Sequence, residues 1–317
     1  MDDEIPDTIT IYQRYCPSGV KRILATGTNA FIGEVDDSTV LKYPLIPGRD
    51  IDRLEVERKL LEIVNPHERI IGLKGVSSDT GGLYLERAQN GSLGNYLFNP
   101  ESQHPLPSVK QRLAWCREVA EAVAWIHSRR VLHCDLHPWN VLLDDGLHVK
   151  LADFQGRHLS EAGSVLLDGW SAEPTRFFCP RDDPFDADVN TEIFALGCTI
   201  YYIMMGHAVF PDIIDGKKGW REKVADRFEK GLFPQEKHVC SAVTLKCWRR
   251  EYRSAQEVVR DIISLENSAK PDIMSSKSVD SVSWSWSLIL FPVQAIRRVF
   301  GVFVFLEGWI FSMLGLR

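Results

Sequence analysis

The chain has 317 residues, 44% of them hydrophobic and 25% charged, which is typical of a globular protein large enough for two lobes or domains. The formal net charge is −6 and lysine and arginine form no block, so we expect no binding to nucleic acid. The seven cysteines contain no CxxC pair, and the acidic start of the chain has no apolar core. We therefore predict a reducing, cytoplasmic compartment and no secretory signal.

The first part of the chain is predicted to be rich in β-strands. Residues 1–20 carry little periodicity and are expected to form an N-terminal extension over the surface. The pattern over residues 23–43 indicates a hairpin, with a glycine-containing bend near its start, a D-D-S turn at 36–38 and Lys42 near its end. This first domain is expected to cover residues 21–88.

One helix is predicted within the first domain. Apolar residues recur at helical spacing from Ile51 to Val64, and the following Asn65-Pro66 ends the pattern. Two more stretches, residues 70–76 and 83–86, have the composition of strands.

After Ala88 the pattern becomes helical. Helices are predicted at residues 109–128, 193–205 and 242–265. The second of these is almost wholly apolar, which indicates a buried central helix, and it is too short to cross a bilayer. The second domain, residues 89–266, is therefore mainly helical, and the fold class is α+β.

The stretch from Val131 to Gly156 carries the residues most suited to chemistry. Two short apolar runs, 141–143 and 149–152, are joined by the turn D-D-G and should form a small hairpin. At the edges of this hairpin lie three polar residues, Asp135, Asn140 and Asp153. Two carboxylates and one carboxamide around one ribbon suit the binding of a divalent cation and the orientation of a hydroxyl nucleophile.

The end of the chain has a different composition. Residues 267–283 are rich in serine and predict a polar linker, whereas residues 284–317 form a strongly hydrophobic tail. The run 299–316 contains one charge, Glu307, and would reach roughly 27 Å as a helix, barely the thickness of a hydrocarbon core. Three alternatives remain open: the tail crosses a membrane, lies on its surface, or packs on the folded domain.

The order of these parts resembles the eukaryotic protein kinase family, from about residue 20 to 265. A strand, a glycine turn, a strand and a lysine precede a helix with an acidic residue, and an H-x-D-x-x-x-x-N loop precedes D-F. The resemblance implies a bilobal fold, with a small β-rich lobe followed by a larger helical one. It also implies ATP- and Mg²⁺-dependent transfer of the γ-phosphoryl group to a protein hydroxyl, here expected to be serine or threonine.

The resemblance assigns roles to individual residues. Lys42 would hold the α- and β-phosphates, and Glu57 would be its partner, with Glu55 and Glu62 as weaker options. Asp135 would be the catalytic base. Asn140 and Asp153 would bind magnesium. The nucleotide would contact the glycine turn, the strand lysine and the hinge, that is Ala25, Gly27, Ala30, Ile32, Lys42, Leu85, Glu86 and Ala88.

Three later segments favour a protein kinase over a small-molecule kinase. Residues 177–181, F-F-C-P-R, resemble the A-P-E end of the activation segment, and residues 192–197 resemble the D-x-W-S-x-G helix start, with Glu192 in the aspartate position. Residues 247–255 resemble the C-W…R-P-S-A segment, without its proline. The partner implied is a protein substrate.

The sequence also departs from the family pattern. Of the G-x-G-x-x-G glycines only Gly27 remains, between Ala25 and Ala30. Cys134 replaces the arginine of H-R-D, which removes the usual contact to a phosphorylated activation loop. His137 replaces a lysine, and the resulting loop also resembles that of aminoglycoside and choline phosphotransferases.

Two further departures lie after the hairpin. Gln155 takes the glycine position of D-F-G, with Gly156 following it. Arg181 replaces the glutamate of A-P-E, so we expect a like-charge contact with Arg253 where the family has an ion pair. These changes leave two alternatives open: a pseudokinase that acts as a scaffold, and a small-molecule phosphotransferase. The tail, residues 284–317, adds a predicted membrane contact.

Overall fold

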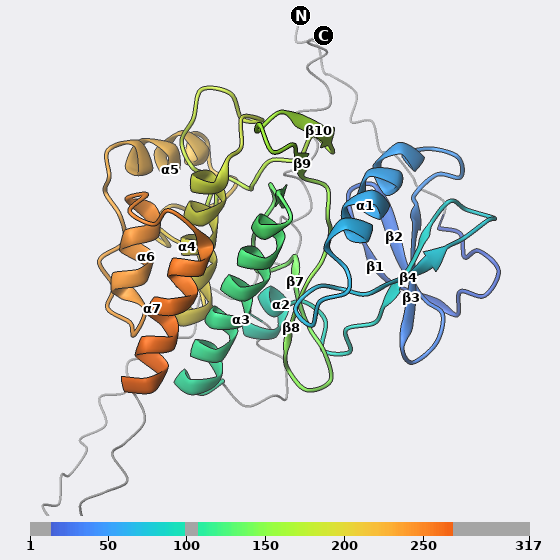
Figure 1. Ribbon diagram of the computed structural model, residues 1–317, viewed down its shortest axis with the longest axis horizontal. Helices are drawn as coiled ribbons and strands as arrows, with labels where there is room; N and C mark the ends of the chain where they lie inside the picture. Colours follow the sequence, from blue (N-terminus) through green and yellow to red (C-terminus); the bar gives the residue numbers. More distant parts are fainter. Residues whose placement is uncertain (1–13, 99–106, 269–317) are drawn as a thin grey trace, which may run out of the picture.

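The computed structural model describes residues 14–98 and 107–268. It has two lobes: a β-sheet with helix α1 forms the smaller one, and helices α2 to α7 form most of the larger one (Figure 1). The hairpin β7–β8 lies between them. The predicted bilobal α+β fold is therefore confirmed.

The smaller lobe contains one antiparallel sheet with the strand order β1-β2-β3-β5-β4. Its strands are β1 (Arg22–Thr26), β2 (Ala30–Glu34), β3 (Thr39–Pro44), β4 (Leu73–Val76) and β5 (Leu83–Glu86). The predicted hairpin over residues 23–43 is thus three strands. Strand β3 is central and buried along its whole length, and it places Lys42 opposite Ile32 on one side and Leu83 on the other.

Helix α1 (Ile51–Val64) has the predicted bounds. It buries Leu54, Leu60, Leu61 and Val64 in the same hydrophobic core as strand residues of the sheet. The chain leaves the helix at Asn65, whose extended backbone suits the residue before a proline. The apolar face fixes the rotation of the helix, so Glu57, which lies on that face, is buried with it.

The larger lobe is built around a buried helix, as predicted. Its helices are α2 (Leu93–Phe98), α3 (Val109–Ser128), α4 (Val189–Met205), α5 (Trp220–Glu229), α6 (Ser241–Trp248) and α7 (Ala255–Ser268). Helix α4 is buried over nearly all of its length and packs against α3 and α6. It begins one turn before the predicted start, because Asp188 and Thr191 form a reciprocal capping box.

The predicted helix over residues 242–265 was wrong in one respect. The chain forms two helices there, α6 and α7, with a break between Trp248 and Ala255. Arg250 within the break has a φ of 56°, the left-handed conformation that ends a helix. No glycine marks this position, so the sequence carried no local signal for the break.

Two small sheets connect the lobes to the segment that follows Asp153. The predicted hairpin is present as β7 (Val141–Leu143) and β8 (Val149–Leu151), and β6 (Val131–Leu132), β9 (Arg157–Leu159) and β10 (Val165–Asp168) form a second sheet. The N–H of Ile71 donates to Leu151 O at 2.9 Å, and that of Asn90 to Leu143 O at 3.0 Å. The chain on either side of β4 and β5 is therefore bonded to the hairpin, which sets the position of one lobe on the other.

Gly156 lies where no side chain fits. A Cβ at this position would be 2.0 Å from the carbonyl oxygen of Leu132 and 2.4 Å from that of His133. Gly169 approaches the same backbone from the other side, and its N–H donates to Gly156 O at 2.9 Å. The required glycine is thus the residue after Gln155, one position later than in the family pattern.

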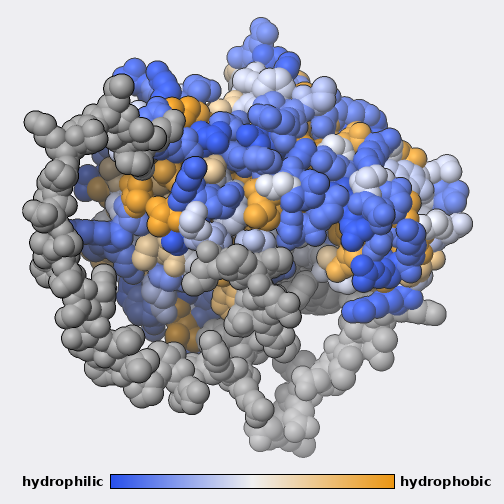
Figure 2. Space-filling model, turned by 90° about the horizontal axis from the view of Figure 1, so that it is seen from below, coloured by the Kyte–Doolittle hydropathy of each residue, from blue (hydrophilic) through white to orange (hydrophobic). Residues whose placement is uncertain are grey.

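Several sequence predictions lie outside the described residues: most of the N-terminal extension (1–13), the linker from 269 to 283, and the tail, 284–317. None of the helices in the described part of the chain has both the length and the apolar character needed to cross a membrane. The face shown in Figure 2 is mainly hydrophilic where it is described, with hydrophobic residues in small separate groups.

Candidate active site

The centre of the site is the ammonium group of Lys42. Its Nζ lies 2.6 Å from Glu57 Oε2, and the Glu57 side chain is fully buried. The alternatives Glu55 and Glu62 are excluded as partners, because both carboxylates bind Arg58 on the exposed side of the helix. Strand β3 and helix α1 together therefore select one glutamate for Lys42.

The same ammonium group contacts Asp153. Lys42 Nζ lies 2.5 Å from Asp153 Oδ1, which joins the smaller lobe to the segment after the hairpin. Asp153 has a φ of 64°, a left-handed conformation that is uncommon outside glycine and occurs at functional sites. The Asp153 side chain is 41% exposed, so it faces the space between the lobes.

Burial and charge act in opposite directions on these three groups. Burial alone would lower the pKa of Lys42, but the carboxylates of Asp153 and Glu57 outweigh it and raise that pKa. Burial raises the pKa of Glu57 to about 7, against the attraction of Lys42. Burial also opposes ionisation of Asp153, but Lys42 outweighs it, so the pKa of Asp153 is lowered. Lys42 and Asp153 are therefore the firmly charged pair.

A second group of polar residues surrounds Asp135. Asn140 Nδ2 donates to the main-chain oxygen of Asp135 at 2.9 Å and to its Oδ2 at 3.1 Å. His137 Nδ1 accepts from the N–H of Trp139 at 3.2 Å, so a neutral imidazole carries its proton on Nε2. That Nε2 lies 3.3 Å from Asp135 Oδ1. Asp135 Oδ2 thus accepts a hydrogen bond from Asn140, and Oδ1 lies beside the imidazole of His137.

Glu192 of α4 fixes the backbone of the two residues before Asp135 by hydrogen bonds. Glu192 Oε1 accepts from the N–H groups of His133 at 2.5 Å and Cys134 at 2.9 Å, and Oε2 contacts His127 Nε2 at 2.5 Å. Cys134 has a φ of 61°, which this double hydrogen bond stabilises. Glutamate in place of the family's aspartate therefore still reaches the loop that carries Asp135.

The residues predicted to hold a metal are Asn140 and Asp153. The Asn140 side chain uses its Nδ2 for Asp135, which leaves its amide oxygen as a ligand, and Gln155 Nε2 donates to Asp153 Oδ1 at 3.1 Å. No cluster of three or more His, Cys, Asp or Glu residues that could hold a metal occurs in the described ranges. Two protein oxygens suit a Mg²⁺ ion that takes its other ligands from phosphates and water.

Three of the predicted nucleotide residues, Leu85, Glu86 and Ala88, lie where the chain leaves β5 for the larger lobe. Leu85 is buried at the end of β5, while the Glu86 side chain points to Gly72 N (3.0 Å) and to Lys150 Nζ (3.0 Å). The N–H of Ala88 donates to no group in the described part of the chain, so it is available to an adenine edge. Its carbonyl accepts from Gly91.

The glycine turn connects β1 to β2. Gly27 N donates to Ala30 O at 2.8 Å, and a Cβ at position 27 would lie 3.4 Å from that oxygen. Gly27 does not have a positive φ, so the turn is compatible with the alanines at its flanks. Ala25 is exposed, Ala30 is buried, and Ile32 is half-buried beside Lys42.

The expected like-charge contact of Arg181 was wrong. Arg181 Nη2 lies 2.7 Å from Oε2 of Glu173, whose side chain is fully buried. Arg253 is exposed, and its backbone N–H donates to Glu257 Oε2. Sequence reasoning missed Glu173, although a charge reversed at one member of an ion pair is a reason to look for an acidic residue nearby.

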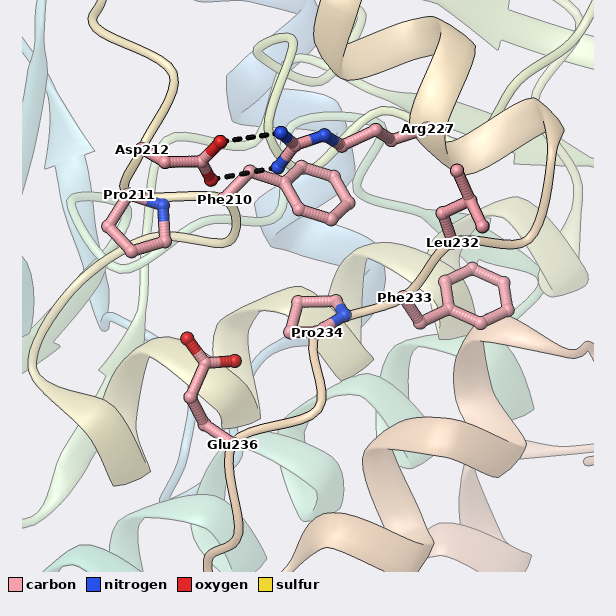
Figure 3. Close-up of a pocket in the computed structure, with 8 residues that line it drawn as sticks. All are labelled: Phe210, Pro211, Asp212, Arg227, Leu232, Phe233, Pro234 and Glu236. Atoms are coloured by element: carbon pink, nitrogen blue, oxygen red, sulfur yellow. Dashed lines mark hydrogen bonds and ion pairs between the residues drawn. The ribbon is translucent and has the colours of Figure 1, made fainter.

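A cavity with a volume of about 240 Å^3 lies elsewhere in the larger lobe (Figure 3). It is lined by Phe210, Pro211, Asp212, Arg227, Leu232, Phe233, Pro234 and Glu236. Arg227 and Asp212 bind each other across its edge, so the cavity offers no free cation and contains none of the predicted catalytic residues.

Comparison with known proteins gives one consistent result. The chain matches the family described as "Protein kinase domain" over residues 46–279; the match begins after strand β3. The human tyrosine-protein kinase Srms is 30% identical over 197 residues, which are 58% of this chain and 38% of Srms. The gamma catalytic chain of Mus musculus phosphorylase b kinase, liver/testis isoform, is 28% identical over 233 residues, 66% of this chain and 56% of that protein.

A third similar protein is the 3-phosphoinositide-dependent protein kinase 1 of Arabidopsis thaliana, 27% identical over 169 residues, 50% of this chain and 34% of that protein. The chain therefore spans between about a third and somewhat over half of the length of these relatives.

The raised pKa of Glu57 predicts a pH-dependent stability. A carboxyl whose pKa rises from 4.5 in the unfolded chain to about 7 in the folded one stabilises the fold at low pH, and this contribution is lost as the pH rises towards 7. We compare the free energy of unfolding of the wild type with that of Glu57→Gln. Between pH 5 and 7.5 the wild type should lose on the order of 2 kcal/mol relative to the variant, which corresponds to about 5 °C in melting temperature.

The control is Glu62→Gln on the exposed side of the same helix, which should leave that difference unchanged. Melting curves of the full chain at both pH values measure the effect. A wild type that becomes more stable relative to Glu57→Gln as the pH rises would contradict the assignment.

Proposed function

We propose that this chain, which belongs to the protein kinase domain family, transfers the γ-phosphoryl group of ATP to a serine or threonine hydroxyl of a protein, with Mg²⁺ as cofactor. The observation that supports this best is the joint placement of Lys42, Glu57 and Asp153 within 2.6 Å contacts, beside the Asp135–Asn140 pair. Phosphoryl transfer depends mainly on positioning and electrostatics, which this set of residues can supply.

In this proposal each residue has one task. Lys42 lies against the α- and β-phosphates, and Glu57 holds its ammonium group in place. Asn140 and Asp153 would hold magnesium, which offsets the charge that develops on the phosphates during transfer. Asp135 accepts a hydrogen bond from the acceptor hydroxyl, orients it, and takes its proton as the new bond forms.

The proposed acceptor is a short side chain. The rings of His137 and Phe177 lie 5.9 Å apart, and His137 contacts the base, so the segment that carries Phe177 runs close to Asp135. The closeness of this segment to Asp135 favours a short acceptor side chain, serine or threonine, over the longer tyrosine. Because similar proteins include a tyrosine-protein kinase, both acceptor types belong in the assay.

Specific observations keep two other functions in view. His137 in the H-x-D-L-H-P-x-N loop favours a small-molecule phosphotransferase, and the loss of two loop glycines favours a pseudokinase scaffold. The pair formed by buried Lys42 and half-buried Asp153 argues against the scaffold, because a chain without catalysis has no need to keep these charges together.

The decisive assay incubates the full chain with labelled ATP, Mg²⁺ and protein substrates. We expect label on serine or threonine, and a loss of about 10²–10⁴-fold in rate for Asp135→Asn, since that is what a positioned base contributes. The exposed Asp79→Asn serves as a matched control and should keep full activity.

Label on tyrosine alone would overturn the acceptor assignment. Label only on small aminated or hydroxylated acceptors would favour the small-molecule reading. No label, together with no thermal shift from ATP and Mg²⁺, would favour the scaffold.

We also propose that the tail, residues 284–317, contacts a membrane and brings a cytoplasmic kinase domain to its surface. The proposal rests on its composition alone, a run of 18 residues (299–316) with one charge. A fluorescent reporter fused to residues 281–317 should sediment with membranes after fractionation. A reporter that stays in the supernatant would exclude the anchor.

A further inference from the structure

The segment from Glu173 to Arg181 is closed on itself by a buried ion pair. Arg181 Nη2 lies 2.7 Å from Glu173 Oε2, and the two side chains are 9% and 0% exposed. The guanidinium also donates from Nε and Nη2 to Pro184 O, and from Nη1 to Cys179 O. Its face covers the ring of Phe178 at 4.2 Å. All three nitrogens of Arg181 are therefore used within its own part of the chain.

This pair is a poor source of net stability. Removing two charges from water offsets most of their attraction, and apolar replacement of a whole buried pair is often neutral. Burial raises the pKa of Glu173 to about 7 against the attraction of Arg181, and its Oε1 has no hydrogen-bond partner in the described part of the chain. The pair is better explained by the geometry that it imposes.

The middle of the closed segment is attached to the rest of the lobe. Arg176 donates to the carbonyl oxygens of Phe210 at 3.0 Å and Ile213 at 2.5 Å, and it pairs with Asp215. The next residue, Phe177, is buried, and its N–H donates to Pro174 O at 2.7 Å. The backbone on both sides of Phe177 is therefore anchored, by Arg176 before it and by the ion pair that closes the segment.

That position is next to the catalytic base. The ring of Phe177 lies 5.9 Å from that of His137, and His137 Nε2 lies 3.3 Å from Asp135 Oδ1. The other side of the imidazole is fixed by Trp139, through its N–H and its ring. Contacts thus run from Phe177 through His137 to Asp135, and the ion pair closes the segment that carries Phe177.

We infer that Glu173 and Arg181 are positioning residues for the acceptor: their ion pair shapes the segment beside the base and, through Phe177, sets the orientation of His137 and Asp135. The inference rests on the proposed kinase function. Unlike an ion pair to Arg253, this one needs no contact with the chain between α6 and α7. Within the described ranges, the hydrogen bonds and the ion pair of Arg181 stay inside residues 173–184, so ATP binding at Lys42 should not depend on them.

The test compares Arg181→Met, Glu173→Gln and the double variant in the full chain. We expect the catalytic efficiency for the protein acceptor to fall about tenfold or more in each single variant, while the KM for ATP stays within about twofold. The two changes should be non-additive, with the double variant no worse than the worse single one, because both remove the same contact. The matched control is Arg227→Met, which breaks the exposed pair with Asp212 and should change neither constant.

Equal changes in the KM for ATP and the KM for the protein acceptor would overturn the inference and indicate general destabilisation. Additive losses of catalytic efficiency in the double variant would do the same. A second readout does not need turnover: the imidazole C–H resonance of His137, assigned with His137→Gln, should shift in Arg181→Met and stay unchanged in Arg227→Met. An unmoved resonance in Arg181→Met would also overturn the inference. If the wild type transferred no phosphoryl group but the His137 resonance still shifted in Arg181→Met, the proposed function would be refuted. The positioning of His137 by the ion pair would still be supported.

Discussion

The interaction on which this structure depends is the contact of one ammonium group with two carboxylates from different parts of the chain. Lys42 comes from the central strand of the sheet, Glu57 from the helix that covers it, and Asp153 from the end of the hairpin between the lobes. A buried lysine requires a negative partner. The two ion pairs of Lys42 therefore hold the sheet, helix α1 and the larger lobe together around the space where phosphates would lie.

The departures from the family pattern are matched by changes close to them. The glycine that the backbone requires after Phe154 is present one residue late, at Gly156, where a Cβ would be 2.0 Å from a carbonyl oxygen. Glu192, in place of an aspartate, binds the backbone of the loop that carries Asp135. Arg181 forms an ion pair with Glu173. Each change keeps a geometric or electrostatic requirement while altering the residue that meets it.

The elements that could be predicted were those with a local signal. Helix α1 follows from apolar spacing that ends at Asn65-Pro66, and the β7–β8 hairpin follows from two apolar runs around a D-D-G turn. The break at Arg250 and the strands β9 and β10 depend on backbone conformation and pairing far along the chain. Within the site, Lys42 and Asp153 could be predicted as site residues from their residue types and their order along the chain. The role of Glu173 depends on burial, which one sequence does not reveal.

The central claim is that Lys42, held by Glu57 and Asp153, forms a binding site for the phosphates of ATP. Calorimetric titration of the full chain with ATP, with and without Mg²⁺, tests it most directly. The account predicts saturable binding that strengthens with Mg²⁺ and weakens at least about tenfold in Lys42→Met, a loss of about 1.4 kcal/mol or more. Equal affinity of the wild type and Lys42→Met for ATP with Mg²⁺ would contradict it.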